Sequence, residues 1–306
     1  MRRSLLLLAP RRLEWVGEPL AAPGEGELLV ETLAGAISVG SELPLYRGDE
    51  RASRPTTYPR MTGYESLGVV RAAGSGVSSP AVGERVVATY GHRDAALVPA
   101  AKAIPVPPGL PEELALLGIL SCDVAKGIGK LAPRADEPVL ISGAGTIGLL
   151  TLWVLRAQGV RTVDVIEPLP ERRVLAETLG AAHAWTPDEL THDGYAAGFE
   201  CSSRDAAFAR LQRTMRHDGR ICILSDGNVE PLTLTPEFHA RELAVVGSSD
   251  GLDYQAHARW FFPRVQDGRS GLERLFDCHV TTAELPATFE RLATGELRAV
   301  KVLVRY

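Results

Sequence analysis

The sequence has few cysteines and no long hydrophobic run. Only four of its 306 residues are cysteines, and no two of them form a C-x-x-C pair. They are Cys122, Cys201, Cys222 and Cys278. This scatter argues against a disulfide framework and a structural zinc cluster, and it favours a reducing, cytoplasmic location. No segment approaches the roughly twenty apolar residues that a membrane span requires.

A strong charge of either sign is also missing. The net charge is −5, so no general attraction to nucleic acid or to an anionic membrane is expected. Hydrophobic residues make up 45% and charged residues 23% of the chain, as is typical of a globular protein. The length of 306 residues suits about two domains. The first ten residues resemble a signal peptide, but their apolar stretch is too short, and we expect a first strand there.

The most informative segment that is present is a glycine turn between an apolar strand and a helix. Gly143, Gly145 and Gly148 stand at G-x-G-x-x-G spacing, with Thr146 and Ile147 between the last two. The first glycine permits a sharp turn, the second lets the backbone approach a pyrophosphate, and the third lets helix and strand pack closely. The positive end of the helix dipole then faces the phosphates. The segment predicts a dinucleotide site.

An acidic residue follows this turn at the expected distance. Glu167 ends the next apolar strand, about twenty residues beyond the last glycine, where a carboxylate accepts hydrogen bonds from the adenosine ribose. Arg172 and Arg173 come shortly after it, and either could stack on adenine or meet a 2′-phosphate, although solvated helix positions are the simpler expectation. Because Glu167 repels a 2′-phosphate, NAD is favoured over NADP.

The pattern of elements divides the chain into three parts. Residues 1–120 are rich in short strands and turns, which predicts a compact β-rich domain. Residues 121–255 alternate strands with helices, which predicts a doubly wound parallel sheet of the Rossmann type. Residues 256–306 contain two helices, a short segment around His279 and a last strand.

This layout resembles the medium-chain dehydrogenase/reductase superfamily over nearly the whole chain. The matching stretches are residues 63–70, 83–86, 104–107, 143–148, 242–243 and 246–248. The resemblance implies an α/β fold in which a Rossmann domain is inserted into a β-rich, GroES-like catalytic domain built from both ends of the chain. It also implies an oxidoreductase that transfers hydride between a nicotinamide cofactor and a small molecule.

The sequence departs from the zinc-dependent members of that family at the metal ligands. Val39, Tyr64 and Ile119 stand where the resemblance implies the catalytic ligands, and Glu65 alone remains of that set. Valine and isoleucine carry no donor for zinc. The lobe that holds a structural zinc in the family is missing as well. We therefore expect neither a catalytic nor a structural metal ion.

Without zinc, hydrogen bonds or a proton donor must polarise the substrate oxygen. Tyr64 and Ser41 are the candidates, because the resemblance places them beside nicotinamide and substrate. Tyr64 could also be a mere space-filler. Glu65 is expected to organise the site floor, and Asp123 is an alternative acid. His92 is expected at the surface.

The resulting hypothesis is a zinc-independent, NAD(P)-dependent oxidoreductase acting on a carbonyl or alcohol. One alternative is a quinone or enone (C=C) reductase, and another is a non-catalytic redox sensor that binds a dinucleotide. We expect a cytoplasmic protein with a small-molecule substrate, no nucleic-acid or membrane partner, and a homodimer or homotetramer. Pairing would use the last Rossmann strand, near residues 243–247.

Overall fold

The computed structural model describes residues 2–49, 57–225 and 230–306. The chain forms two compact units. One combines Met1–Ile119 with Asp253–Tyr306, and the other is the continuous segment Leu120–Leu252. Each unit has its own sheet and its own hydrophobic core.

The two-segment unit is mostly β-structure, with a few short helices. From its first segment come β1 (Arg2–Ala9), β2 (Arg12–Glu18), β3 (Glu27–Ile37), α1 (Val39–Arg47), β4 (Arg60–Met61), β5 (Glu65–Ala73), β6 (Arg85–Ala88), β7 (Ala95–Pro99), the 3-10 turn Ala100–Lys102, β8 (Ile104–Pro105) and α2 (Glu112–Leu116). From its second segment come α8 (Tyr254–Val265), the 3-10 turn Leu272–Leu275, β15 (Phe276–Thr281), α9 (Leu285–Thr294) and β16 (Lys301–Arg305).

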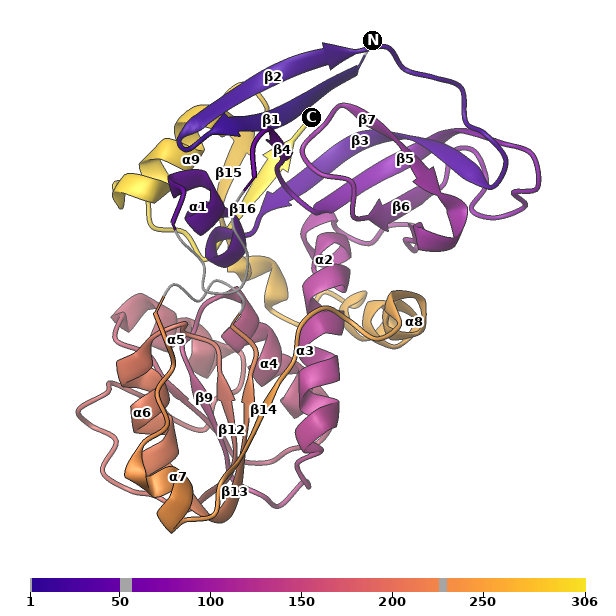
Figure 1. The fold of residues 1–306 in the computed structure, drawn as a ribbon. Helices are drawn as coiled ribbons and strands as arrows, with labels where there is room; N and C mark the ends of the chain where they lie inside the picture. Colours follow the sequence, from indigo (N-terminus) through magenta and orange to yellow (C-terminus); the bar gives the residue numbers. More distant parts are fainter. Residues whose placement is uncertain (1, 50–56, 226–229) are drawn as a thin grey trace. The chain divides into compact units, whose positions relative to one another are not determined.

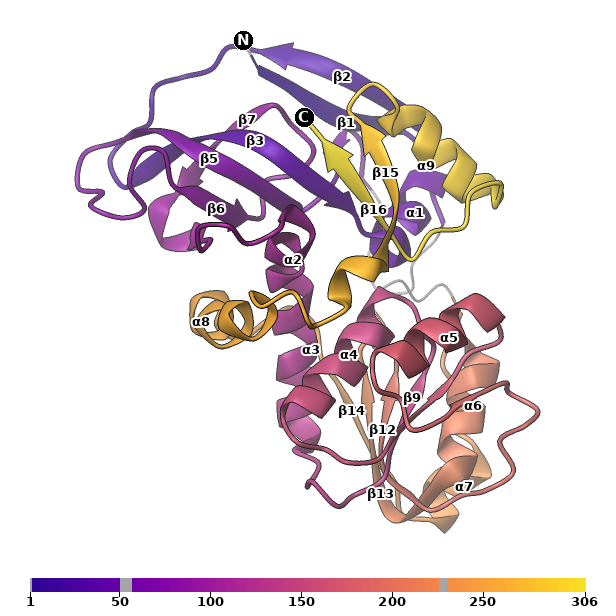
Figure 2. The same cartoon turned by 180° about the vertical axis from the view of Figure 1, so that it is seen from behind.

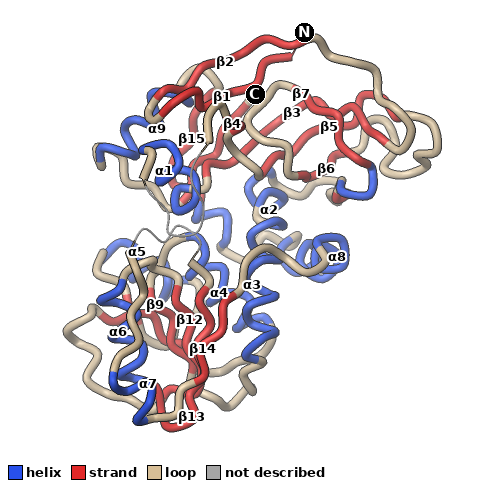
Figure 3. Tube along the Cα trace, viewed as in Figure 1, coloured by secondary structure: helices blue, strands red, loops and turns tan. Residues whose placement is uncertain are grey.

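The main sheet of this unit joins strands from both ends of the chain. Its order is β15-β16-β3-β5-β6-β8, with β7 also paired to β3, and β2-β1-β4 form a smaller sheet. The last strand, β16, runs antiparallel to β3, so the C-terminal strand lies beside one of the first (Figure 1). Figure 3 shows β1 and β2 side by side as a hairpin. The predicted β-rich GroES-like domain and its first strand are confirmed.

Helix α1 was not predicted. It contains Gly40 and Pro44, which both disfavour a helix interior, and this explains the missing signal. The helix ends at Gly48, whose φ of 76° is the left-handed conformation that commonly closes a helix. Its buried face packs in a core with Leu5, Ile37 and Phe289. The segment that carries Ser41 is therefore a packed helix rather than a loop.

The continuous unit alternates strands and helices. Its elements are β9 (Val139–Ser142), α4 (Thr146–Ala157), β10 (Val163–Ile166), α5 (Pro170–Thr178), β11 (Ala184–Trp185), β12 (Tyr195–Glu200), α6 (Asp205–Thr214), β13 (Met215–Ile223), α7 (Pro236–Ala240) and β14 (Ala244–Gly247). Helix α3 (Gly118–Leu131) leads into it from the first unit.

The six strands of this unit form one parallel sheet. Their order is β11-β10-β9-β12-β13-β14, so the order reverses between β9 and β12. Helices α4 and α5 cover one face of this sheet and α6 covers the other, as the two opposite views show (Figures 1 and 2). Ligands of such sheets bind at the carboxyl ends of the strands next to the reversal point. The predicted Rossmann sheet is confirmed.

Strand β14 is the outer strand of this sheet on one side. Its central Val245 and Val246 are half-buried within the chain. The expected pairing of two copies through this edge stays a prediction. No helix among the described residues is long and apolar enough to span a membrane.

Candidate functional site

The glycine turn follows β9 and uses each glycine for a different reason. Gly143 has a φ of 95°, and its N–H donates to the carbonyl of Ile166 (2.8 Å). A Cβ on Gly148 would lie 1.8 Å from the carbonyl oxygen of Gly143, so only glycine allows this packing. A Cβ on Gly145 would have no atom within 4 Å. Nothing within this turn requires Gly145, which leaves open space beside the start of α4.

The open space at Gly145 is suited to a phosphate. Gly145 is the N-cap of α4, has an ordinary φ of −79°, and brings no side chain to cover the helix N-terminus. Thr146 and Ile147 form the first turn of this helix, where backbone N–H groups and the helix dipole favour an anion. The residues present thus fit a dinucleotide pyrophosphate.

Glu167 lies directly beside this turn. The carboxylate is 4% exposed; Oε2 accepts from the N–H of Ala144 (2.8 Å) and Oε1 from that of Leu169 (3.0 Å). Each oxygen retains a further lone pair for a ribose hydroxyl. Arg173, expected as a solvated residue, instead donates to the carbonyls of Glu167 (2.9 Å) and Pro168 (2.8 Å).

These bonds change the assignment of the two arginines. Because Arg173 Nη1 is hydrogen-bonded to the backbone carbonyls of Glu167 and Pro168, we regard Arg172 as the better candidate for contact with the adenosine end of the cofactor. Arg172 is the third residue of α5 and is half-buried.

A second polar group is gathered in the two-segment unit around Tyr64. The Tyr64 hydroxyl donates to Ser38 Oγ (2.5 Å) and lies 3.0 Å from Ser41 Oγ. Ser38 directly precedes α1 and Ser41 lies in its first turn, while Tyr64 precedes β5. Burial raises the pKa of Tyr64, and the charge of Glu65 raises it further. The phenol therefore stays protonated at neutral pH and can donate a hydrogen bond.

Glu42 holds these hydroxyl groups in place. One of its oxygens accepts from the N–H of Ser38 (2.8 Å) and the other from the N–H of Gly63 (2.8 Å). Glu42 is 6% exposed, and His92 Nε2 lies 3.4 Å from its Oε2. The carboxylate thus ties the start of α1 to the residue before Tyr64. The surface position expected for His92 is wrong, since His92 is 1% exposed.

Glu65 forms a buried ion pair with Lys301 that was not predicted from the sequence. Its Oε1 lies 2.7 Å from Lys301 Nζ, both side chains are fully buried, and Oε2 has no hydrogen-bond partner. Burial raises the pKa of Glu65 while the Lys301 cation opposes that rise. Lys301 is the first residue of β16 and Glu65 the first residue of β5, so this ion pair joins the two strands next to Tyr64.

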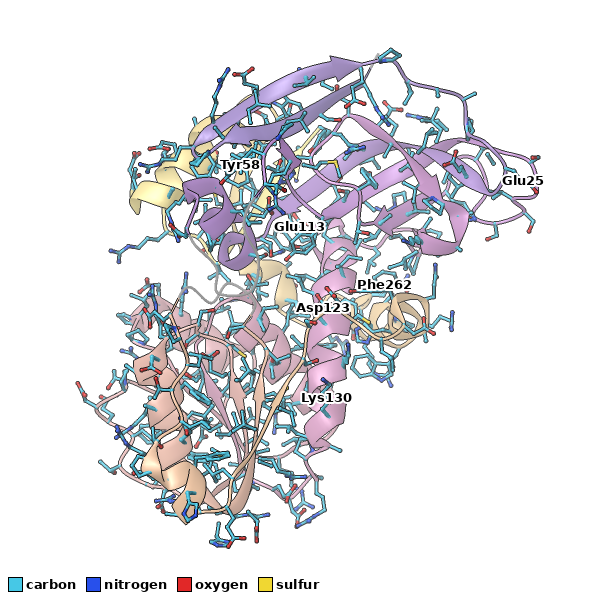
Figure 4. All side chains as sticks on the ribbon, viewed as in Figure 1. Glu25, Tyr58, Glu113, Asp123, Lys130 and Phe262 are labelled. Carbon is cyan, nitrogen blue, oxygen red and sulfur yellow. The ribbon has the colours of Figure 1, made fainter. Side chains whose placement is uncertain are left out.

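Asp123 and a cluster of polar side chains around Tyr195 belong to the continuous unit. Asp123 is on α3, the helix that also carries Lys130 (Figure 4). Asp164, His183, His192 and Tyr195 line a pocket of about 260 Å³ that opens near the amino end of β12. The Tyr195 hydroxyl donates to Asp164 Oδ2 (2.6 Å). Among the described residues, no group of three histidine, cysteine or acidic side chains could hold a metal ion.

Comparison with known families covers most of the chain. Residues 24–108 match the alcohol dehydrogenase GroES-like domain, and residues 146–262 match the zinc-binding dehydrogenase domain. The L-threonine 3-dehydrogenase of Deinococcus radiodurans is 28% identical over 267 residues, which cover 72% of this chain and 75% of that protein.

Solved structures share the fold over the full length. A Sinorhizobium meliloti protein described as a zinc-binding dehydrogenase, bound to NADP, has a TM-score of 0.85 at 23% identity and covers 100% of this chain and 99% of its own. The 2R,3R-butanediol dehydrogenase of Bacillus subtilis has a TM-score of 0.84 at 20% identity, with 100% of both chains covered. These structures show the shared fold, and the two matched domains with the threonine 3-dehydrogenase relative place the chain in the medium-chain dehydrogenase/reductase family of the zinc-containing alcohol dehydrogenases, as an NAD(P)-dependent dehydrogenase.

Proposed function

We propose that the protein interconverts a secondary alcohol and a ketone with NAD(H), and that hydroxyl groups take the place of a catalytic zinc ion. The observation that carries the proposal is the hydrogen-bonded set of Ser38, Ser41 and Tyr64. The family resemblance implies that Tyr64 replaces a metal ligand. The substrate class is suggested by threonine 3-dehydrogenase and butanediol dehydrogenase, whose names describe secondary alcohols.

The side chains at this place do not fit a zinc site. Val39 packs against the core of its unit and Ile119 is 3% exposed, and neither carries a donor. Of the two carboxylates nearby, Glu42 is bonded to backbone N–H groups and Glu65 to Lys301. A zinc ion would have to break these buried bonds to gain ligands. No step of the proposed mechanism therefore uses a metal.

The mechanism assigns the proton steps to the hydroxyl groups. When bound, the nicotinamide supplies or accepts the hydride. During ketone reduction, Tyr64 donates its proton to the substrate oxygen, and Ser38 or Ser41 relays a proton from solvent to the phenol oxygen. Oxidation runs the same transfers in reverse. Because the pKa of Tyr64 is raised, the phenol is a hydrogen-bond donor throughout the neutral range. Glu42 positions Ser38 and takes no proton.

The choice of NAD over NADP rests on Glu167. Its buried carboxylate is held by two backbone N–H groups, so it cannot turn away from a 2′-phosphate without losing them. The negative charge therefore opposes NADP and accepts the ribose hydroxyls of NAD.

The direct test is turnover by the purified protein of known metal content. We expect oxidation of secondary alcohols with NAD to exceed that with NADP, with less than one zinc per ten chains by elemental analysis and no loss of rate with a chelator. Stoichiometric zinc together with chelator-sensitive turnover would refute the zinc-free mechanism. Turnover confined to enones or quinones would favour the C=C reductase over the alcohol enzyme.

Removing the Tyr64 hydroxyl tests its role as proton donor. Tyr64→Phe keeps the ring and is expected to lower kcat by at least about tenfold, because a positioned proton donor contributes roughly 10²–10⁴ to the rate. Ser41→Ala should have a smaller effect of the same kind. NADH affinity and Tm serve as controls and should stay close to the wild-type values. An unchanged kcat in Tyr64→Phe would make Tyr64 a space-filler and Asp123 the next candidate.

A further inference from the structure

One face of the β1–β2 hairpin collects two arginines and a serine far from the glycine turn in sequence. In the hairpin register, Arg2 is opposite Glu18 and Ser4 is opposite Val16. On the other side of β1, Ser4 pairs with Arg93 in an isolated antiparallel bridge. Side chains two apart on a strand, and those directly paired across strands, share a face of the sheet. Arg2, Ser4, Glu18 and Arg93 therefore lie on one face.

The pairing between Ser4 and Arg93 also brings their side chains close. The bridge is bounded by bonds from Leu5 N to His92 O (2.8 Å) and from Asp94 N to Arg3 O (3.0 Å). The paired residues themselves exchange no backbone bond. In such pairs the two Cα atoms are about 4.5 Å apart, closer than in the alternative pairing.

Three hydrogen-bond donors on this face lack a close acceptor. Ser4 is fully buried and its Oγ has no short hydrogen bond, although the hydroxyl lies near enough to Glu18 to lower the pKa of that carboxyl. Arg2 donates Nη2 to Glu18 (3.0 Å), but its buried Nε has no partner. Arg93 also has a buried Nε without a partner, and its guanidinium forms no hydrogen bond or ion pair with any residue that the structure describes. Buried donors are nearly always paired, so three together require an explanation.

This face also carries an excess of positive charge. Two guanidinium groups share one carboxylate, Glu18, which is already bonded to Arg2. Burial lowers the pKa of Arg93, and the positive charge of Arg2 lowers it further, against the opposing effect of Glu18. Arg93 is half-buried and Arg2 has 19% of its side chain exposed, so both side chains are in part open to solvent.

We propose that Arg2, Ser4 and Arg93 form an anion site, which binds phosphate or the phosphate group of a monoester. A guanidinium offers a planar fork of donors that matches phosphate oxygens, and the serine hydroxyl supplies a further donor. Two guanidinium groups and a hydroxyl can donate hydrogen bonds to three oxygens of a tetrahedral anion, whereas a carboxylate has only two oxygens. One bound phosphate would give partners to all three unpaired donors and neutralise the excess charge.

The test is the effect of phosphate on thermal stability at constant ionic strength, with potassium chloride as the replaced salt. Saturating NADH is present throughout, so that phosphate cannot act at the glycine turn. We expect phosphate to raise the Tm of the wild type in a saturable way. In Arg93→Met this rise should disappear, with phosphate affinity reduced by about tenfold or more, as for loss of a hydrogen-bonded charged group. In chloride alone, Arg93→Met should be at least as stable as the wild type.

Two further variants complete the design. Arg12→Gln removes an exposed arginine of β2 that pairs with Glu14 and should keep the full phosphate response. Ser4→Ala should leave the Tm in chloride unchanged and weaken the response, and it serves as the main variant if Arg93→Met does not fold. Tighter binding of glycerol phosphate than of inorganic phosphate would identify a monoester as the ligand, and the reverse would identify free phosphate. The proposal would be overturned if phosphate and chloride changed the Tm of the wild type equally. It would also be overturned if phosphate raised the Tm of Arg93→Met as much as that of the wild type.

Discussion

Replacing Gly145 with alanine should weaken NADH binding by at least about tenfold and leave the fold intact. The reason is that the absence of a side chain at the second glycine of the motif lets the backbone approach the pyrophosphate. Gly145 has an ordinary φ, and a Cβ there would meet nothing within 4 Å, so the apo-protein does not require glycine. Gly145→Val fills more of the same space and should abolish measurable binding. Titration of NADH fluorescence gives the affinity, and thermal melting without cofactor gives the stability.

Gly148 provides the matched comparison within the same turn. A Cβ at this position would lie 1.8 Å from the backbone oxygen of Gly143, so Gly148→Ala should destabilise the apo-protein by about 1–3 kcal/mol or more. The two variants thus separate binding from folding. If Gly145→Ala lowers the Tm as much as Gly148→Ala, or binds NADH normally, the phosphate is not at Gly145.

Lys301→Met should destabilise the protein by about 3–5 kcal/mol, the usual cost of leaving a buried charge without its partner. Glu65 would lose the partner of its Oε1, and its Oε2 has no hydrogen-bond partner among the described residues even in the wild type. With Lys301 gone, the strongest influences that lower the pKa of Glu65 are lost, while burial and the charge of Glu42 still raise it. The folded state then binds a proton that the unfolded state has released. Stability of the variant should therefore fall as the pH rises above the unfolded pKa of about 4.3.

Denaturant unfolding at several pH values measures this effect. Adding Glu65→Gln to Lys301→Met removes the unpaired charge and should recover much of the stability, because neutral replacements of a buried pair cost far less. The control is Arg291→Met, which removes an ion pair with Glu296 whose side chains are 49% and 65% exposed. It should cost less than about 1 kcal/mol. A double variant as unstable as Lys301→Met alone would show that packing, not charge, is lost.

The glycine turn could be predicted from the sequence because its information is local. Gly143, Gly145 and Gly148 stand within six residues, and the strand and helix around them have clear patterns. Glu167 follows at a distance fixed by one helix and one strand. Gly143 and Gly148 have the structural reasons that the motif implies, and Gly145 leaves the open space that the motif assigns to the pyrophosphate.

The surroundings of Tyr64 could be predicted only in part. Ser41, Tyr64 and Glu65 came from the family resemblance, and their roles stay predictions. Lys301 was missed because 236 positions separate it from Glu65, and no spacing rule joins a strand to the end of the chain. Ser38 and Glu42 were missed because α1 was not predicted. With that helix in hand, a serine before its first turn and a glutamate four residues on would have suggested their contact.

The position of β16 has a consequence for synthesis on the ribosome. This strand lies between β15 and β3 in the main sheet, yet it follows every other strand of that sheet in the sequence. The edge of strand β3 therefore lacks this neighbour while residues 38–300 are made, on the order of ten seconds or more at the usual rate of translation. The continuous unit, Leu120–Leu252, has all its strands by then. A newly made chain must keep the open edge of β3 from pairing with other strands until β16 emerges.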